Sequence, residues 1–415
     1  MSKVSAIKGF LAGLITLASV IGCSSDPGLL NPDLLNPPQD INAFSDVSSA
    51  GVGKYPVFVT FNNAYKGLVE ENEAIGRRDP NNADKHFTKL INSAKSTLDG
   101  AFYDIGDPDI VNAFIRAHKR GVKVRILTDT ENLNDRETGA LKKVIQDLKT
   151  AGIELKDDKR SALMHHKFLI VDNNIVWTGS LNLSTSSIYH HNNNSVMVTS
   201  PQIAANFNAE FKRIFEQGIL GPNPHEIPHK EVVVGGASIR TYFSPKGGAI
   251  GAIAEELRKS KKSIKFMAFS MTDKNIRDIM TAKKTAGLKV EGIFDMCLSK
   301  NASIYWDLKK SNILSLRDGN QALMHHKTMI IDDETVVTGS FNFSNSAEQS
   351  NNENCLIIKS PTIAKLFNAE YSRLKYASYN NKNLPEYDHP ACKSAPKPPV
   401  APTPAQPTEP AEATE

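Results

Sequence analysis

One block of sequence occurs twice in this chain, and this repeat constrains the fold more than any other feature. M-H-H-K-F-L-I-V-D at 164–172 matches M-H-H-K-T-M-I-I-D at 324–332, an offset of 160 residues. The same offset aligns T-G-S-L-N-L-S at 178–184 with T-G-S-F-N-F-S at 338–344. Upstream, 121–129 parallels 287–295 at an offset of 166, so the linking segments differ by six residues. Several matching blocks in the same order indicate an internal duplication.

Each copy alternates short β-rich runs with helical apolar patterns, which favours an α/β fold. We expect two duplicated lobes, each a mainly β-sheet core flanked by helices, related by a pseudo-two-fold axis. The predicted bounds are 55–220 for lobe 1, 221–231 for a turn-rich connector and 232–380 for lobe 2. The expected strands are 57–61, 101–103, 122–127, 167–171, 175–178, 239–243, 266–269, 290–294, 327–331 and 335–338, and the expected helices are 84–96, 110–119, 249–261 and 276–285.

The two ends of the chain differ from this pattern. Residues 1–22 combine two lysines with an apolar stretch at 9–21, which is shorter than the roughly 20 residues of a membrane span. The stretch ends in V-I-G-C at 20–23 and resembles a bacterial lipoprotein signal, although Val20 stands where leucine is usual. The resemblance implies lipidation of Cys23 and, because Ser24 follows, an exported lipoprotein of the outer membrane; the alternative is an ordinary secretory signal. Residues 23–54 then form a tether, and the Pro-rich 393–415 a disordered tail.

Composition adds few constraints. The chain has 415 residues, of which 40% are hydrophobic and 23% charged, as is ordinary for globular proteins. A net charge of +4 neither argues for a nucleic-acid partner nor excludes one. Beyond Cys23, an exported chain could pair two of Cys297, Cys355 and Cys392, and the sequence does not say which two.

The repeated blocks share the spacing H-x-K-x(4)-D-x(6)-G-S-x-N. A histidine and a lysine two residues apart on a strand point to the same side, so each lobe offers one imidazole and one ammonium. The complete motif resembles the phospholipase D superfamily, and the resemblance covers nearly all of 55–380. Its residues are His165, Lys167, Asp172, Gly179, Ser180 and Asn182 in the first copy, and His325, Lys327, Asp332, Gly339, Ser340 and Asn342 in the second.

The resemblance implies one active site shared by both lobes. One imidazole attacks phosphorus and forms a phosphohistidine, and the other protonates the leaving oxygen and then activates water. The glycines let a phosphate approach backbone N–H groups, whereas the aspartates hold strand and loop together. The groups expected to hold the phosphoryl oxygens are Lys167, Lys327, Ser180, Asn182, Ser340 and Asn342.

The two copies differ just after the motif, where Asn193 aligns with Glu353. In related two-lobe enzymes this acidic residue orients the histidine of the first lobe, which raises its basicity. By resemblance His165 is the nucleophile, Glu353 its partner and His325 the acid/base. The reversed assignment of the two histidines is the alternative.

The sequence therefore predicts a phosphodiesterase that needs no cofactor. Its histidine pairs lack the Cys, Asp or Glu at ligand spacing that zinc sites use, so we expect no metal. Hydrolysis of a phospholipid head group, releasing phosphatidic acid, suits a tether to the membrane through Cys23. The alternatives are an endonuclease with the same mechanism and, more remotely, a non-catalytic binding lipoprotein. Because both half-sites lie in one chain, we expect a monomer.

Overall fold

The computed structural model describes residues 56–381, apart from 63, 65–66, 136, 223–225 and 301–303. The predicted signal segment, Cys23, the tether, Cys392 and the Pro-rich tail all lie outside the described residues. Within the described part, no helix combines the length and apolar character needed to cross a membrane.

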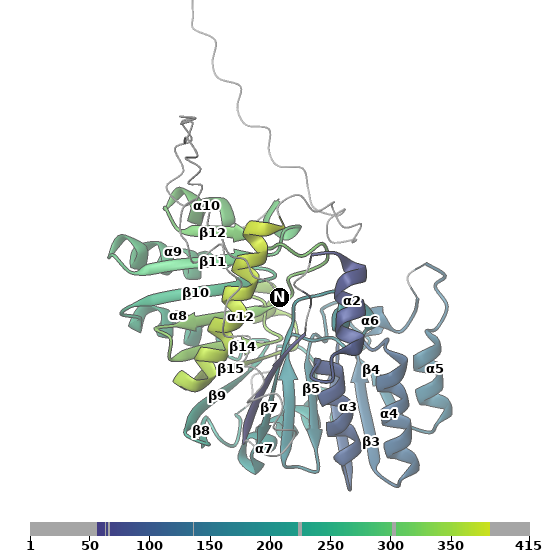
Figure 1. Cartoon of the computed structure of the whole chain (residues 1–415). Helices are drawn as coiled ribbons and strands as arrows, with labels where there is room; N and C mark the ends of the chain where they lie inside the picture. The colour runs from purple at the N-terminus through teal and green to yellow at the C-terminus, as the bar shows by residue number, and fades with distance from the viewer. Residues whose placement is uncertain are drawn as a thin grey trace, which may run out of the picture. The chain divides into compact units, whose positions relative to one another are not determined.

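The strands of the described chain form two sheets (Figure 1). The first sheet has the order β1-β7-β6-β5-β2-β3-β4 and the second β12-β11-β10-β13-β14-β15-β9-β8. Strands of the first sheet are β1 (Val57–Phe61), β2 (Thr97–Phe102), β3 (Lys123–Thr128), β4 (Glu154–Asp157), β5 (Lys167–Val171), β6 (Ile175–Gly179) and β7 (Asn194–Thr199). Strands of the second are β8 (Glu231–Val234), β9 (Ala237–Ser244), β10 (Ser263–Ala268), β11 (Lys289–Phe294), β12 (Leu314–Arg317), β13 (Lys327–Ile331), β14 (Thr335–Gly339) and β15 (Glu353–Lys359).

The second sheet repeats the first and adds β8 at one edge. In both, three neighbouring strands are parallel (β2-β3-β4 and β10-β11-β12), and the remaining pairs are antiparallel. The α/β class and the duplicated architecture are thus confirmed. The helices are α2 (Val69–Arg78), α3 (Ala83–Ser93), α4 (Pro108–Lys119), α5 (Lys143–Thr150), α6 (Thr185–Tyr189), α7 (Pro201–Phe211), α8 (Ala249–Lys259), α9 (Lys274–Thr285), α10 (Tyr305–Lys310), α11 (Asn345–Gln349) and α12 (Pro361–Asn380).

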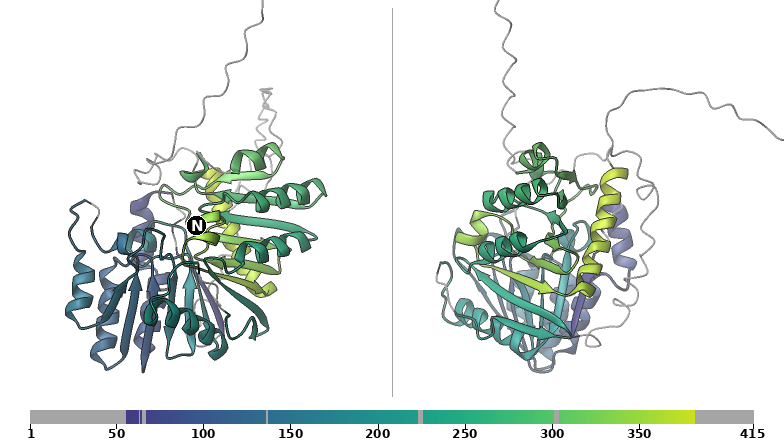
Figure 2. Two further views of the ribbon diagram at one scale, coloured as in Figure 1. Left: turned by 180° about the vertical axis from the view of Figure 1, so that it is seen from behind. Right: turned by 90° about the vertical axis from the view of Figure 1, so that its left-hand side faces the viewer.

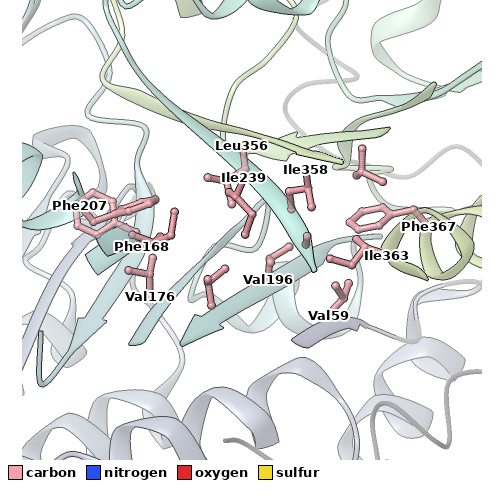
Figure 3. Packing of buried hydrophobic residues seen from close by; sticks show 14 of the residues in the cluster. Val59, Phe168, Val176, Val196, Phe207, Ile239, Leu356, Ile358, Ile363 and Phe367 are labelled. Carbon is pink, nitrogen blue, oxygen red and sulfur yellow. The ribbon is translucent and has the colours of Figure 1, made fainter. Parts of the chain in front are cut away.

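Each central strand is buried on both faces, because successive side chains enter different cores. In β5, Leu169 and Val171 belong to a core shared with α3, α4 and α5. Phe168 and Ile170 belong to a second core that contains residues of both lobes. That shared core is drawn in Figure 3.

The shared core is built by an exchange between the lobes. Phe207 of α7 packs edge-to-face on Phe243 of β9, with ring centroids 5.0 Å apart. The matching contact joins Phe61 of β1 to Phe367 of α12, at 5.1 Å. β1 of lobe 1 therefore packs on α12 of lobe 2 (the yellow helix in Figure 2), and β9 of lobe 2 packs on α7 of lobe 1, so the lobes bury apolar surface against each other.

Two of the cysteines are described. Cys297 is disulfide-bonded, whereas Cys355 is free and buried in β15. Burial raises the pKa of the Cys355 thiol well above its usual range, so this thiol is not a reactive nucleophile.

Separating the lobes should destroy the site. A fragment of residues 55–225 exposes Phe61, Phe168 and Phe207, which the full chain buries, so we expect it to aggregate or to dimerise. Light scattering after size exclusion, with hydrolysis of bis(p-nitrophenyl) phosphate, checks this expectation. A monomeric fragment with the turnover of the full chain would contradict it.

Candidate active site

The two motif histidines are each held by the backbone of the opposite lobe. His165 lies just before β5, and its N–H donates to the carbonyl oxygen of Asn352 at 2.9 Å. In the equivalent contact of the other lobe, the N–H of His325 donates to the carbonyl oxygen of Asn192, also at 2.9 Å. Short parallel bridges, Met164 with Asn352 and Asn192 with Met324, complete this junction. The candidate site therefore lies at the interface between the two lobes.

Both histidines line one cleft of about 510 Å³. Asn182 of lobe 1 and Asn342 of lobe 2 line it as well, so the predicted residues converge from two segments 160 positions apart. Within the described ranges, no group of three or more His, Cys, Asp or Glu side chains is arranged to hold a metal ion. The remaining lining residues are Tyr103, Asp104, Asn132, Asp135, Glu137, Lys142, Leu163, Ser184, Ser186, His191, Phe269 and Leu323.

The imidazole of His165 has a carboxylate behind it. Its Nδ1 lies 2.7 Å from Oε2 of Glu353, which is fully buried at the start of β15. The hydroxyl of Ser340 donates to the same oxygen at 2.7 Å. A carboxylate accepts the Nδ1 proton, so Nε2 is left with the lone pair that can react. Burial lowers the pKa of His165 to about 4, although Glu353 opposes that shift, so the imidazole is neutral near pH 7.

His325 has neutral neighbours in the corresponding place. Its Nδ1 lies 3.0 Å from Oδ1 of Asn193 and 3.1 Å from the carbonyl oxygen of Ser180. Both are acceptors, so Nδ1 of the neutral ring carries the proton here as well and the lone pair lies on Nε2. Burial lowers the pKa of His325 well below 6.5, and the charges of Lys327 and His191 add to that shift. At the aligned positions 193 and 353, His325 thus contacts a neutral amide, whereas His165 contacts a carboxylate.

The motif lysines are buried, and no carboxylate of the described residues lies at hydrogen-bond distance from either ammonium group. Nζ of Lys167 donates to the carbonyl oxygen of His165 at 2.9 Å, and Nζ of Lys327 donates to that of His325 at 2.7 Å. Each ammonium also lies over an aromatic ring, Tyr103 at 5.0 Å and Phe269 at 4.6 Å. Burial lowers the pKa of Lys167 to about 7 and that of Lys327 well below 10.5. Two desolvated ammonium groups favour an anion between them.

The serines of the motif lie elsewhere than the sequence predicted. Ser180 and Ser340 are fully buried, and their hydroxyls donate to Asn193 (2.8 Å) and Glu353 instead of facing the cleft. In the structure they hold the groups that orient the two histidines, because a hydroxyl bound on both sides has no donor left for phosphate. Asn182 and Asn342, in contrast, do line the cleft.

The glycines are required by the neighbouring strand. Gly179 has φ +149° and Gly339 φ +138°, and a Cβ there would lie 2.2 Å from the carbonyl oxygen of Asn194 and 2.3 Å from that of Asn354. The sequence interpretation assigned this space to a phosphate, whereas the structure fills it with backbone.

The aspartates lie away from the cleft. Asp172 accepts hydrogen bonds from the N–H groups of residues 95–97, at 2.7 to 2.9 Å. Asp332 does the same for residues 261–263, also at 2.7 to 2.9 Å. These contacts tie the turn after β5 to the start of β2 in lobe 1, and the turn after β13 to the start of β10 in lobe 2.

Several residues of the site were not singled out from the sequence. The second histidines of the pairs are fully buried, and Nε2 of His166 contacts Glu210 at 3.0 Å while that of His326 contacts Glu370 at 3.1 Å. The repeated F-N-A-E blocks that contain these glutamates were a usable signal. Tyr103 and Phe269 align at the offset of 166, but nothing in their immediate sequence marks them as cleft residues.

Comparison with known proteins identifies the family. The family model described as "Cardiolipin synthase, PLD-like domain" matches residues 87–215 and 253–375, together more than half of the chain. The chain therefore belongs to the phospholipase D superfamily.

Individual relatives align with only part of the chain. Human mitochondrial cardiolipin hydrolase is 35% identical over 131 residues, which are 31% of this chain and 49% of the relative. A protein of Rickettsia conorii named phospholipase D is 29% identical over 159 residues, 38% of this chain and 80% of the relative. The chain spans about half the length of the cardiolipin hydrolases that it matches.

One solved structure, matched over most of both chains, supports the fold. Phosphatidylserine synthase of Haemophilus influenzae matches 85% of this chain and 95% of its own, with a TM-score of 0.56 and 12% identity. At that identity the likeness concerns the fold alone. The phospholipase D family member Nuc of Salmonella typhimurium is 26% identical over 39% of this chain and 94% of its own, with a TM-score of 0.32.

The buried ammonium of Lys167 generates a prediction about binding. Dimethyl phosphate carries one negative charge that does not titrate between pH 6 and 9 (roughly the range around the pKa of Lys167). Because the pKa of Lys167 is lowered to about 7, the ammonium is charged below that pH and loses its charge above it. We therefore expect the affinity for dimethyl phosphate to fall as the pH rises through this range.

Calorimetric titration at several pH values measures this. Lys167→Gln should bind more weakly and with a flatter pH dependence, whereas Lys143→Gln, on an exposed side chain, should follow the wild-type curve. An affinity that does not change between pH 6 and 9 in the wild type would show that Lys167 keeps its charge.

Proposed function

We propose that this chain hydrolyses the head-group phosphodiester of a phospholipid through a phosphohistidine on His165. The observation that carries the proposal is the pair of buried imidazoles in one cleft, one backed by a carboxylate and the other by an amide. The superfamily supports the coarser statement that the chain is a phosphodiesterase.

The first step transfers the phosphatidyl group. Nε2 of His165 attacks phosphorus while the bond to the head-group oxygen breaks. To act as the acid, His325 must carry a second proton on Nε2, and the anionic diester bound beside it favours this cationic form. That proton passes to the leaving oxygen, so the head group leaves as a neutral hydroxyl. As the new N–P bond makes the ring of His165 cationic, the carboxylate of Glu353 stabilises it through Nδ1–H.

The second step releases the product. A water molecule attacks phosphorus as His325, now neutral, takes its proton, and the N–P bond breaks. Phosphatidic acid leaves, and both imidazoles return to their starting states. Lys167 and Lys327 offset the negative charge of the phosphoryl oxygens, together with the amides of Asn182 and Asn342.

The charge of the cleft supports a lipid over a nucleic acid. Among the described residues, Asp104, Asp135 and Glu137 line it, and the lysine that lines it, Lys142, is paired with Asp104 at 2.8 Å. A polynucleotide would bring further phosphates toward these carboxylates, which repel them. A phospholipid brings one or two diesters, and one of them can reach the two buried lysines without further phosphates along the cleft. The names of the relatives, cardiolipin hydrolase and phospholipase D, favour the same substrate class.

Substrate choice is tested on the full chain in excess EDTA. We expect phosphatidic acid from phosphatidylcholine or phosphatidyl products from cardiolipin, and little cleavage of plasmid or single-stranded DNA. His165→Ala serves as the blank for contaminating activity. Faster cleavage of DNA than of either lipid would favour the endonuclease alternative, and an absolute need for one divalent ion would overturn the mechanism.

The roles of the two histidines give a separate prediction. His325→Ala should still react with a p-nitrophenyl ester of phosphatidic acid, because p-nitrophenolate needs little protonation, and should then stall as the adduct. General acid–base assistance contributes roughly 10²–10⁴-fold, so we expect turnover to fall by about that factor. Mass spectrometry after quenching should find the phosphoryl group on a peptide containing His165.

Glu353→Gln should slow formation of the adduct without moving it. In His165→Ala no adduct should form. An adduct on His325 in that variant would reverse the assignment of nucleophile and acid/base.

A further inference from the structure

The two halves of the cleft differ at a second pair of aligned positions. His191 of lobe 1 corresponds to Asn351 of lobe 2 at the repeat offset of 160. His191 lines the cleft, and its ring centroid lies 6.0 Å from that of His325, at an interplanar angle of 47°. Asn351 makes different contacts. Its Nδ2 donates to Oε1 of Glu353 at 3.4 Å, and its Oδ1 accepts from the N–H of Leu163 at 3.3 Å. Only lobe 1 therefore presents a third imidazole to the cleft at this position.

The backbone holds His191 in place. Its N–H donates to the carbonyl oxygen of Ser186 at 3.1 Å, and its carbonyl oxygen accepts from the side chain of Asn62. The next residue, Asn192, is the one whose carbonyl oxygen binds the N–H of His325. A single short segment thus fixes the backbones of His191 and His325 together. The side chain of His191 is also buried, so it loses little entropy when it binds a substrate.

The neighbouring histidine points elsewhere. Nε2 of His190 lies 2.6 Å from Oε2 of Glu73 in α2, and His190 is not among the residues that line the cleft. The chain therefore offers two adjacent histidines on one turn, of which one faces the cleft.

We propose that His191 is a third catalytic imidazole, which donates a hydrogen bond to a phosphoryl oxygen on the His325 side of the cleft. This inference rests on the proposed phosphodiesterase function and deepens it. An imidazole carries at least one N–H in either protonation state, so it can donate to an anionic oxygen throughout the reaction. The motif serines are bound elsewhere and add no donor on this side of the cleft. A fixed donor is most valuable where negative charge develops in the transition state.

The test compares three variants of the full chain. His191→Leu removes the donor and keeps a side chain of similar size, whereas His191→Asn installs the residue of the aligned position and keeps an N–H. His190→Asn is the matched control. Each is assayed on short-chain phosphatidylcholine and on bis(p-nitrophenyl) phosphate, and for its affinity for dimethyl phosphate.

We expect His191→Leu to lose about 10²-fold in kcat, the effect of removing one oxyanion donor, and by a similar factor on both substrates. Its affinity for dimethyl phosphate should fall as well. His191→Asn should recover part of both losses, and His190→Asn should match the wild type. Equal losses are expected because a phosphoryl oxygen is common to both substrates, whereas a defect in proton transfer falls mainly on the poorer leaving group.

Two outcomes would overturn the proposal. One is turnover by His191→Leu within about threefold of the wild type with unchanged binding. The other is a loss confined to phosphatidylcholine, which would mean that His191 acts through His325 and does not contact phosphate. If the wild type hydrolyses the aryl diester and neither phosphatidylcholine nor cardiolipin, the lipid assignment fails. The role of His191 is still decided by the aryl diester and by binding. If His191→Leu does not fold, the same measurements on His191→Asn, compared with His190→Asn, decide whether His191 contacts phosphate.

Discussion

The structure depends on two hydrogen bonds that cross between the lobes, from the N–H groups of His165 and His325 to the carbonyl oxygens of Asn352 and Asn192. Each bond fixes the backbone of one motif histidine to a segment of the opposite lobe. The next residue of that segment contacts Nδ1 of the same histidine. Glu353 follows Asn352 and contacts His165, while Asn193 follows Asn192 and contacts His325. The distance between the two imidazoles is therefore set by the packing of the lobes, which the buried aromatic pairs of β1, α7, β9 and α12 stabilise.

Within this symmetric frame the chemistry is asymmetric. In the mechanism proposed above, a carboxylate next to His165 favours the cationic ring that would form when its nitrogen bonds to phosphorus. An amide next to His325 fixes the tautomer without adding charge. The same low-dielectric surroundings that lower the pKa of both histidines also lower those of the lysines. The empty cleft is thus an unfavourable place for its own cations, and an anionic diester relieves that cost on binding.

Much of the fold and part of the site could be predicted from the sequence. β5 and β13 have the predicted bounds, because short apolar runs closed by Asn and Asp turns leave little choice of register. Helices α7 and α12 were not predicted. Each contacts strands of both sheets, so its apolar residues show only a weak helical periodicity. Glu353 could be found by aligning the two copies. The contacts of the serines could not be predicted, because the direction of a side chain after a strand depends on which neighbouring backbone it meets.

The covalent link between the lobes has a consequence for how such a site can change. Two identical subunits must carry the same residue at every aligned position, so a homodimer of this architecture would have either two carboxylates or two amides beside its histidines. Once both halves lie in one chain, a substitution in one copy alters one half-site and leaves the other as it was. The differences at 193/353 and at 191/351 are of this kind. Duplication within one chain thus gives each half of the site its own mutational history, so the two histidines, which we propose act as nucleophile and acid/base, can diverge independently.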